Sequence, residues 1–308
     1  MKAKSFLLLS LFTFISIAVQ AQMPPPPASP YRTYVSVNGN DSNASSGCQQ
    51  IAPCRNFNIA LGVTASHGEL VALDSGNYMP FNITQSVTIK AAPGADVTIL
   101  SSGFGDAIAI NAGSSDSIVL HGLTINGSAT SGWTGIHFWT GGALLVENCV
   151  LSDLTNGIRV DGPGKIIVTD TLIRDNQMGV AMQTSSGQIH ATFDRVHIKN
   201  NQFTGIGVWN NTQAVISNSL ITDNFQNGIE VSAGSPGNAV ANIEGCIIKN
   251  NNNGIVSYGG SLARVSHSTI TDNMQGIPSF GGQVLSFGNN RLVGNVTDGF
   301  FTGMVPLQ

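Results

Sequence analysis

Charged residues are scarce in this chain of 308 residues, because Asp, Glu, Lys and Arg together make up only 10% of it, and aromatic residues only 7%. Soluble domains usually carry about 25% charged residues, so this scarcity argues against a coiled coil, a helical bundle with a Glu/Lys surface, and a highly charged disordered tail. Basic residues number 13 against 17 acidic ones and form no cluster. A nucleic-acid partner is therefore not expected.

Long apolar runs are absent after the first 21 residues, so no membrane-spanning segment is predicted there. What the chain has instead is 36 glycines, together with many Ser, Thr and Asn residues. These residue types favour tight turns, and the composition is typical of an all-β chain.

The first 21 residues resemble an export signal. Two lysines precede an apolar stretch over residues 5–19, and Val19 and Ala21 are the small residues that a cleavage site after Ala21 requires. The apolar stretch is shorter than the roughly 20 residues of a spanning helix, which disfavours an uncleaved anchor. We predict a signal peptide over 1–21, a proline-rich linker over 22–31, and a periplasmic or extracellular protein.

Four cysteines remain in the predicted mature chain. Cys48 and Cys54 flank a short loop, and this spacing allows a disulfide in an oxidising compartment without requiring one. No His or Cys partners lie nearby at zinc-ligand spacing, so no metal site is predicted. Between residues 53 and 65, apolar residues at helical spacing predict one short amphipathic helix, and after it the apolar segments have the length of short strands.

A repeat of 22–26 residues dominates the rest of the sequence. Each unit contains a Gly followed by an apolar residue, preceded in most units by an Ile-x-Asp/Asn-Asn segment. Three short strands and three turns in this length make one coil of a parallel β-solenoid. The paired residues are Gly135-Ile136, Gly157-Ile158, Gly179-Val180, Gly205-Ile206, Gly228-Ile229, Gly254-Ile255, Gly276-Ile277 and Gly299-Phe300.

These repeated units resemble the secreted bacterial right-handed parallel β-helix proteins of the pectin-lyase-like superfamily. The resemblance covers roughly residues 32–308 and implies an all-β, right-handed, single-stranded parallel β-helix of roughly ten coils, with the helix near 53–65 as an N-terminal cap. The superfamily includes lyases, hydrolases, epimerases and adhesins, so the resemblance implies a fold and leaves the activity open. In its enzymes the substrate lies across the sheet that corresponds to the Gly-Ile strands.

Two columns of polar residues follow from stacking the coils. Asn176, Asn201 and Asn224 align with equivalent asparagines further on and predict a turn ladder. A neighbouring Asp/Asn column leaves calcium open as a cofactor, but Arg174 and Lys199 lie beside the acids and would partly neutralise them, so no cofactor is predicted. Cys149 and Cys246 occupy equivalent positions four coils apart, too far apart to bridge, and are predicted to be small buried thiols.

The outward residues of the Gly-Ile strands are the candidate site. Because side chains alternate along a strand, the inward column of Ile136 and its equivalents places the intervening residues on the surface. That surface contains aromatic residues with polar neighbours, which suit the apolar faces and hydroxyl edges of sugars. A further tryptophan, Trp133, precedes the strand and is expected to add a wall. Alternatively, loops cover this face and the aromatics pack beneath them. The predicted ligand-binding residues are Trp139, Gln183, Trp209, Glu230 and Tyr258.

Three residues of this face are the candidates for catalysis: His137, Arg159 and Asp161. Asp161 and Glu230 are three coils apart, about 14 Å, which is too far for a glycosidase pair, and Asp161 has no neighbouring carboxylate. The first hypothesis is therefore a protein that binds polysaccharide, or another extended surface ligand, without catalysis. The alternatives are a polysaccharide lyase or related carbohydrate-active enzyme, and a structural or adhesive solenoid with the proline-rich segment as its stalk.

Overall fold

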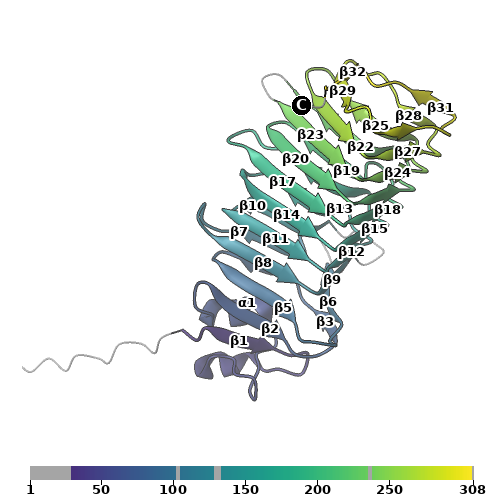
Figure 1. Ribbon diagram of the computed structural model, residues 1–308. Coiled ribbons are helices and arrows are strands. Elements are labelled where there is room, and N and C mark those ends of the chain that lie inside the picture. The colour runs from purple at the N-terminus through teal and green to yellow at the C-terminus, as the bar shows by residue number, and fades with distance from the viewer. Residues whose placement is uncertain (1–28, 102–104, 128–132, 235–237, 307–308) are drawn as a thin grey trace, which may run out of the picture.

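The computed structural model describes residues 29–101, 105–127, 133–234 and 238–306. The predicted signal peptide and most of the predicted linker lie outside these residues. The chain winds into an elongated parallel β-solenoid (Figure 1). Three parallel sheets run along its length, and each coil contributes one short strand to each sheet in turn. The predicted all-β fold is confirmed.

We number the sheets in the order in which the chain passes through them in each coil. Sheet 1 contains, in spatial order, β1 (Arg32–Val35), β2 (Gly68–Ala72), β5 (Val87–Ala91), β8 (Ser117–His121), β11 (Ala143–Glu147), β14 (Gly164–Thr169), β17 (Ile189–Asp194), β20 (Thr212–Ser217), β23 (Ala239–Glu244), β26 (Leu262–Ser266), β29 (Gln283–Ser286) and β32 (Gly303–Met304). Sheet 2 contains β3 (Gly76–Tyr78), β6 (Val97–Ser101), β9 (Leu123–Gly127), β12 (Val150–Ser152), β15 (Leu172–Arg174), β18 (His197–Lys199), β21 (Leu220–Thr222), β24 (Ile247–Lys249), β27 (Thr269–Thr271) and β30 (Arg291–Leu292). Sheet 3 contains β4 (Phe81–Ile83), β7 (Ile108–Asn111), β10 (Thr134–Thr140), β13 (Asn156–Val160), β16 (Met178–Met182), β19 (Ile206–Trp209), β22 (Asn227–Ser232), β25 (Asn253–Ser257), β28 (Gln275–Ile277) and β31 (Thr297–Gly299).

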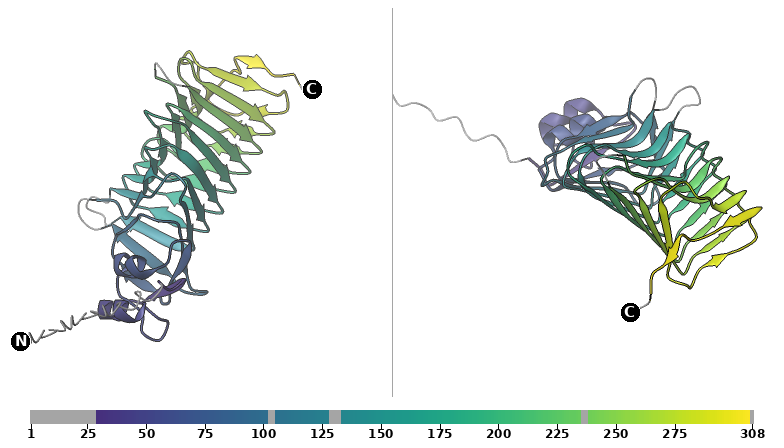
Figure 2. Two further views of the ribbon diagram at one scale, coloured as in Figure 1. Left: turned by 90° about the vertical axis from the view of Figure 1, so that its left-hand side faces the viewer. Right: turned by 90° about the horizontal axis from the view of Figure 1, so that it is seen from above.

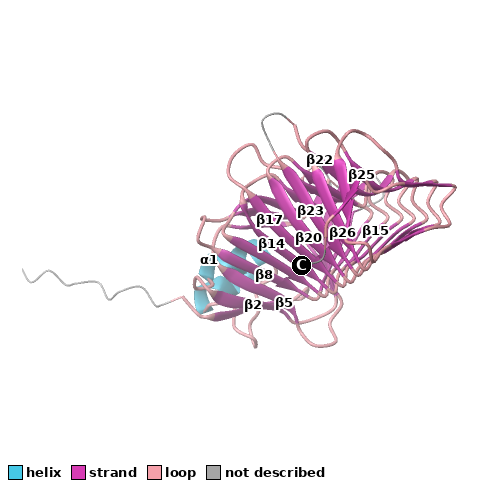
Figure 3. Ribbon diagram, turned by 45° about the horizontal axis from the view of Figure 1, so that its top comes forward, coloured by secondary structure: helices cyan, strands magenta, loops and turns pink. Residues whose placement is uncertain are grey.

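The N-terminal end of the solenoid is covered by helix α1 (Phe57–Val63), which lies within the predicted range (Figures 2 and 3). Its buried face includes Phe57, whose ring stacks on that of Phe81 in β4 at 4.5 Å between centroids. A 3-10 helix, η1 (Asp41–Ser46), precedes α1, and the side chain of Asn40 caps its first turn by accepting from the backbone N–H of Ser42. A disulfide joins Cys48 to Cys54 beside this helix.

The inward column of sheet 3 has the predicted register. Ile136 in β10 pairs with Ile108 on one side and with Ile158 on the other. The column continues through Val180, Ile206, Ile229 and Ile255. All these side chains are fully buried, so apolar residues far apart in sequence form one continuous core along the solenoid axis.

The glycine before each inward residue marks a close contact between coils. A Cβ atom at Gly157 would lie 2.6 Å from the carbonyl oxygen of Gly179 in the next coil. The same contact, at 2.4 Å, holds between Gly179 and Gly205. Because no side chain fits at this distance, the repeated glycine of the sequence is a packing requirement.

The turns between sheets 2 and 3 contain both polar columns. The Asp/Asn column has left-handed backbone conformation at every member, which these residue types tolerate better than others. The asparagine column is buried, and its amides form a continuous ladder: Asn201 Nδ2 donates to Asn224 Oδ1 at 2.8 Å, and Asn224 Nδ2 donates to Asn251 Oδ1 at 3.0 Å. The predicted turn ladder is confirmed. Its left-handed neighbours are Asp153, Asp175, Asn200, Asp223, Asn250 and Asp272.

The two free cysteines are buried and belong to a third ladder, between sheets 1 and 2. The sulfur atoms of Cys149 and Cys246 face the backbone carbonyls two residues earlier. Thr171, Ser219 and Ser268 make the same contact through their hydroxyls in other coils. The thiols therefore replace Ser or Thr in a structural column.

Candidate functional site

The outward face of sheet 3 places the predicted site residues in a regular array. His137 in β10 is paired with Arg159 in β13, one coil away. The same row continues with Ala181, Gly207 and Glu230. Asp161 and Glu230 therefore lie three coils apart, as the repeat predicts.

His137 lies between two carboxylates. Its Nδ1 atom is 2.8 Å from Asp106 Oδ2, and its Nε2 atom is 2.9 Å from Asp161 Oδ2. The residue is 5% exposed, although it points away from the core. Each ring nitrogen of His137 therefore faces a carboxylate oxygen within hydrogen-bonding distance.

Arg159 in β13 completes this cluster, and Asp161 follows directly after the same strand. Its Nε atom donates to Asp161 Oδ2 at 2.6 Å, and its side chain remains partly exposed. Burial acts to raise the pKa of Asp161, but the hydrogen bonds from Arg159 and His137 outweigh it, and the net result is a pKa below the usual value. Asp161 is therefore a carboxylate at neutral pH.

The prediction that Asp161 has no neighbouring carboxylate is wrong, because His137 joins it to Asp106. Asp106 lies just before β7, the strand that pairs with β10 on the side away from Asp161. The Gly-Ile pairs that mark the repeat begin at Gly135-Ile136, so they do not mark the coil that contains Asp106. The segment Ala107–Ile110 alternates like the later Gly-Ile strands, and extending the column by one coil would have placed Asp106 beside His137.

Trp139 is stacked on this cluster. Its ring centroid lies 3.8 Å from that of His137, with 29° between the planes, and 44% of the residue is exposed. It lines a hollow of about 580 Å³ together with Asp106, Trp133, His137 and Arg159, which we call the Trp139 hollow. Trp133 is thus part of the same wall, as expected from its place before the strand.

A second, smaller hollow of about 340 Å³ lies beside it and is lined by Asp161, Gln183 and the turn that follows β16. The Arg159–Asp161 pair stands between the two, since Arg159 lines the first hollow and Asp161 the second. Gln183 is therefore close to the charged cluster, one coil beyond it.

Trp209 and Glu230, two further predicted ligand residues, lie further along the face and contact each other. The indole of Trp209 lies over Gly207, where a Cβ atom would be 2.6 Å from the ring, and its Nε1 donates to Glu230 Oε1 at 3.0 Å. Glu230 also accepts from Asn227 at 2.8 Å and from Thr204 at 3.2 Å. This Glu230 carboxylate is held by three donors within the protein.

Tyr258 is separated from the other aromatic residues of the set. Its ring packs against Phe280, with 5.2 Å between centroids, and it lines a hollow on the turns between sheets 2 and 3. The five predicted ligand residues thus do not line one hollow: Trp139 and Gln183 line two adjoining hollows, Trp209 contacts Glu230, and Tyr258 lines a third hollow.

A protein-family model described as the right handed beta helix region matches residues 134–296, which is more than half of the chain. The chain belongs to the right-handed β-helix family. The handedness that the resemblance implied is thereby supported by the match, together with the parallel sheets described above.

Solved structures place this β-helix among known relatives of the fold. The pectate lyase Pel9A aligns at 15% identity over 90% of this chain and 78% of its own, with a TM-score of 0.57. XylC in complex with xylose aligns at 12% identity over 84% and 70%, with a TM-score of 0.63. An alginate lyase from Paenibacillus sp. str. FPU-7 aligns at 12% identity over 84% and 99%, with a TM-score of 0.54. At these identities the likeness concerns the fold, and no curated protein matches the sequence.

Within the residues that the structure describes, no three His, Cys, Asp or Glu side chains gather in an arrangement that would hold a metal ion. In the same part of the chain, no helix has the length and apolarity to cross a bilayer.

Proposed function

We propose that this protein binds polysaccharide along the outward face of sheet 3, with Trp139 as the central contact, and that it does so without catalysing a reaction. The observation that carries the proposal is the Trp139 indole, which is stacked on His137, partly exposed, and set in the wall of a hollow. A flat aromatic surface in this setting suits the C–H face of a sugar ring.

Polar groups beside the indole suit the hydroxyl edges of the same ligand. Arg159 lines the Trp139 hollow and has N–H groups beyond the one that it gives to Asp161. Gln183 lines the adjoining hollow, one coil further along. Neighbouring strands are about 4.8 Å apart, so an extended chain lying across the strands would meet these groups in succession.

We propose the absence of catalysis because the acid–base groups of the site are already paired with one another. Both nitrogens of His137 face carboxylates, and Asp161 Oδ2 accepts from both His137 and Arg159. The lowered pKa of Asp161 also makes it a poor proton donor at neutral pH. The cluster therefore serves to hold the ring beneath Trp139 in place.

The names of the structural neighbours support carbohydrate as the class of ligand. Their names describe a pectate lyase, a complex with xylose and an alginate lyase. An exported location fits such a ligand, and we propose it here. The Cys48–Cys54 disulfide supports this location, because disulfides persist mainly in oxidising compartments.

The test compares wild type with Trp139→Ala in affinity electrophoresis through gels containing plant, algal and bacterial polysaccharides. We expect at least one polysaccharide to retard the wild type, and Trp139→Ala to weaken that interaction about tenfold. Tyr31→Ala removes an exposed aromatic at the N-terminal end and should leave binding unchanged. Equal retardation of wild type and Trp139→Ala would count against the site, and release of unsaturated or reducing products from the bound polymer would disprove the non-catalytic role.

A further inference from the structure

We propose that the protein has a second binding site, on the turns between sheets 2 and 3, and that its ligand is a neutral saccharide. The site is a hollow of about 890 Å³ that we call the ladder-turn trough. The residues that carry the argument are Asp223, Phe225, Asn253, Tyr258, Asp272 and Met274. The trough is distinct from the Trp139 hollow, which lies on β10 and β13 near the other end of sheet 3.

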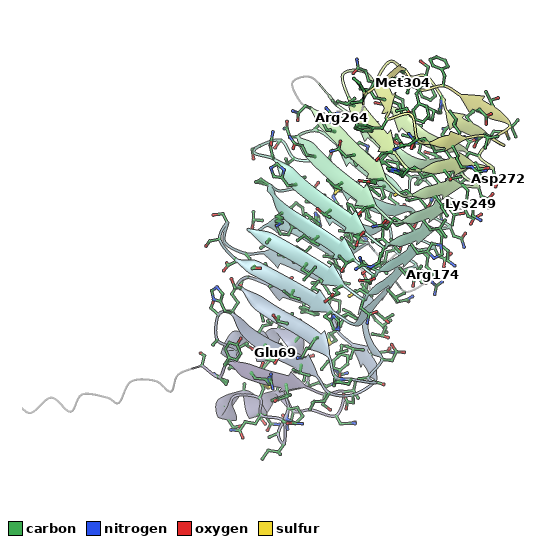
Figure 4. The ribbon with its side chains drawn as sticks, in the orientation of Figure 1. Glu69, Arg174, Lys249, Arg264, Asp272 and Met304 are labelled. Carbon is green, nitrogen blue, oxygen red and sulfur yellow. A yellow bond between two sulfur atoms is a disulfide. The ribbon has the colours of Figure 1, made fainter. Side chains whose placement is uncertain are left out.

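The floor of the trough rests on buried hydrogen bonds. It is lined from three successive turns, which follow β21, β24 and β27. The asparagine ladder lies under these turns, and Asn224, Asn251 and Asn273 are 1–2% exposed. Figure 4 places Asp272 at this edge of the solenoid. A ligand bound here would meet a surface that is already ordered, which lowers the entropic cost of binding.

Apolar side chains are exposed in the trough to a degree that is unusual for a turn. Phe225 is 77% exposed and Met274 is 55% exposed. A neighbouring hollow of about 530 Å³ shares Asp223 and Phe225 and adds Phe203. The Phe225 ring therefore stands between two hollows, with room for a sugar ring against it on either side.

Polar groups with unused hydrogen-bonding capacity surround the aromatic residues. Within the described chain, the Tyr258 hydroxyl has no hydrogen-bond partner, although its ring is held against Phe280. Asn253 Nδ2 donates to Asn227 Oδ1, whereas Asn253 Oδ1 is buried and finds no donor in the same residues. Further amides line the trough beside them. Hydroxyl groups of a saccharide can donate to and accept from such groups.

Charge decides the class of saccharide. Asp223 and Asp272 line the trough, and no Lys or Arg of the described chain does. The pKa of Tyr258 is raised, first by burial of its hydroxyl and second by the negative charge of Glu230, so Glu230 adds to the negative field near the trough. A uronate or sulfated chain would be repelled here, whereas carboxylates accept hydrogen bonds from neutral sugar hydroxyls. The Trp139 hollow differs in this respect, since Arg159 lines it.

The experiment uses Trp139→Ala, in which the first site is disabled, on an array that carries both neutral and uronate oligosaccharides. We expect this variant to keep its binding to neutral glycans. Adding Phe225→Ala should weaken the strongest of these interactions about tenfold by calorimetry, and adding Tyr258→Phe, which removes only the hydroxyl, should weaken it about threefold to tenfold. Ile247→Ala, an exposed aliphatic residue of sheet 2 in the same coil as Asn253, is the matched control and should change nothing.

The outcomes separate this proposal from the proposed function. One result would support the trough proposal and contradict the proposed function at the Trp139 hollow: Trp139→Ala leaves glycan binding intact, and Phe225→Ala in the otherwise wild-type protein removes it. If no neutral glycan binds, or if affinity is equal with and without Phe225, the trough proposal is overturned. A change of oligomeric state in Phe225→Ala by sedimentation velocity, with glycan binding unaltered, would also overturn it, because the trough would then be a protein interface.

Discussion

Trp139 and His137 are stacked two residues apart on one strand, with their ring centroids 3.8 Å apart. Residues at this spacing share a face of a strand, and the bulge that follows Phe138 in the pairing of β10 with β7 adjusts the strand at this point. The exposed indole thus rests on a ring that is itself fixed from both sides by Asp106 and Asp161. The exposed indole and the charged cluster therefore form a single packed unit.

Removal of the His137 ring should destabilise the protein. In His137→Ala, Asp106 and Asp161 lose their shared partner and Trp139 loses its support, so we expect the free energy of unfolding to fall by about 2–4 kcal/mol. Urea denaturation followed by tryptophan fluorescence measures this. His190→Ala, on the exposed face of sheet 1, is the control and should change the value by less than about 0.5 kcal/mol. Equal stability of the two variants would contradict the role given to His137.

Low pH should weaken the His137 cluster, because it protonates the Asp161 carboxylate. Its pKa in the folded protein lies below the usual value of 3.8, so the folded state binds the proton less readily than the unfolded state. The stabilisation is therefore complete above about pH 4 and is lost as the pH falls through the folded-state pKa. We expect the stability difference between wild type and Asp161→Asn to be constant from pH 7 to 5 and to shrink below pH 4. A difference that grows on acidification would refute this assignment.

The asparagine ladder should be sensitive to the loss of a single amide. Asn224 is buried, and Asn224→Ala leaves the Asn201 amide and backbone N–H without their acceptor. We expect a loss of about 2–4 kcal/mol in the free energy of unfolding. Asn252→Ala, an exposed neighbour of the same column, should cost less than about 0.5 kcal/mol, and the two variants compared by denaturant titration give a direct measure of the ladder.

The repeated glycine should not tolerate a methyl group. A Cβ atom at Gly179 would lie 2.4 Å from the carbonyl oxygen of Gly205, so Gly179→Ala must push two coils apart. We expect a loss of about 1–3 kcal/mol and a lower thermal midpoint by calorimetry. Gly259 has open space around its Cβ position, and Gly259→Ala should be neutral or slightly stabilising. A similar midpoint for both variants would mean that the contact between coils relaxes at little cost.

The sequence predicts the arrangement of the candidate site residues only in part, for a geometric reason. The repeat gives the row to which His137, Arg159 and Glu230 belong, because register in a solenoid follows from the length of each coil. It does not give the direction in which a long side chain turns. Trp209 lies back over Gly207, and Asp106 reaches His137 from the coil before the first Gly-Ile pair.

The sequence by itself determined the coil, the inward column and the turn chemistry. Each of these depends on local rules, namely the alternation of side chains, the left-handed turn at Asp or Asn, and the lack of room for a Cβ atom at the repeated glycine. Only the tertiary structure decided which outward side chains meet. The Asp106–His137–Asp161 cluster, the Trp139 hollow and the ladder-turn trough depend on side-chain torsions and on contacts between coils, and no spacing along the chain specifies these.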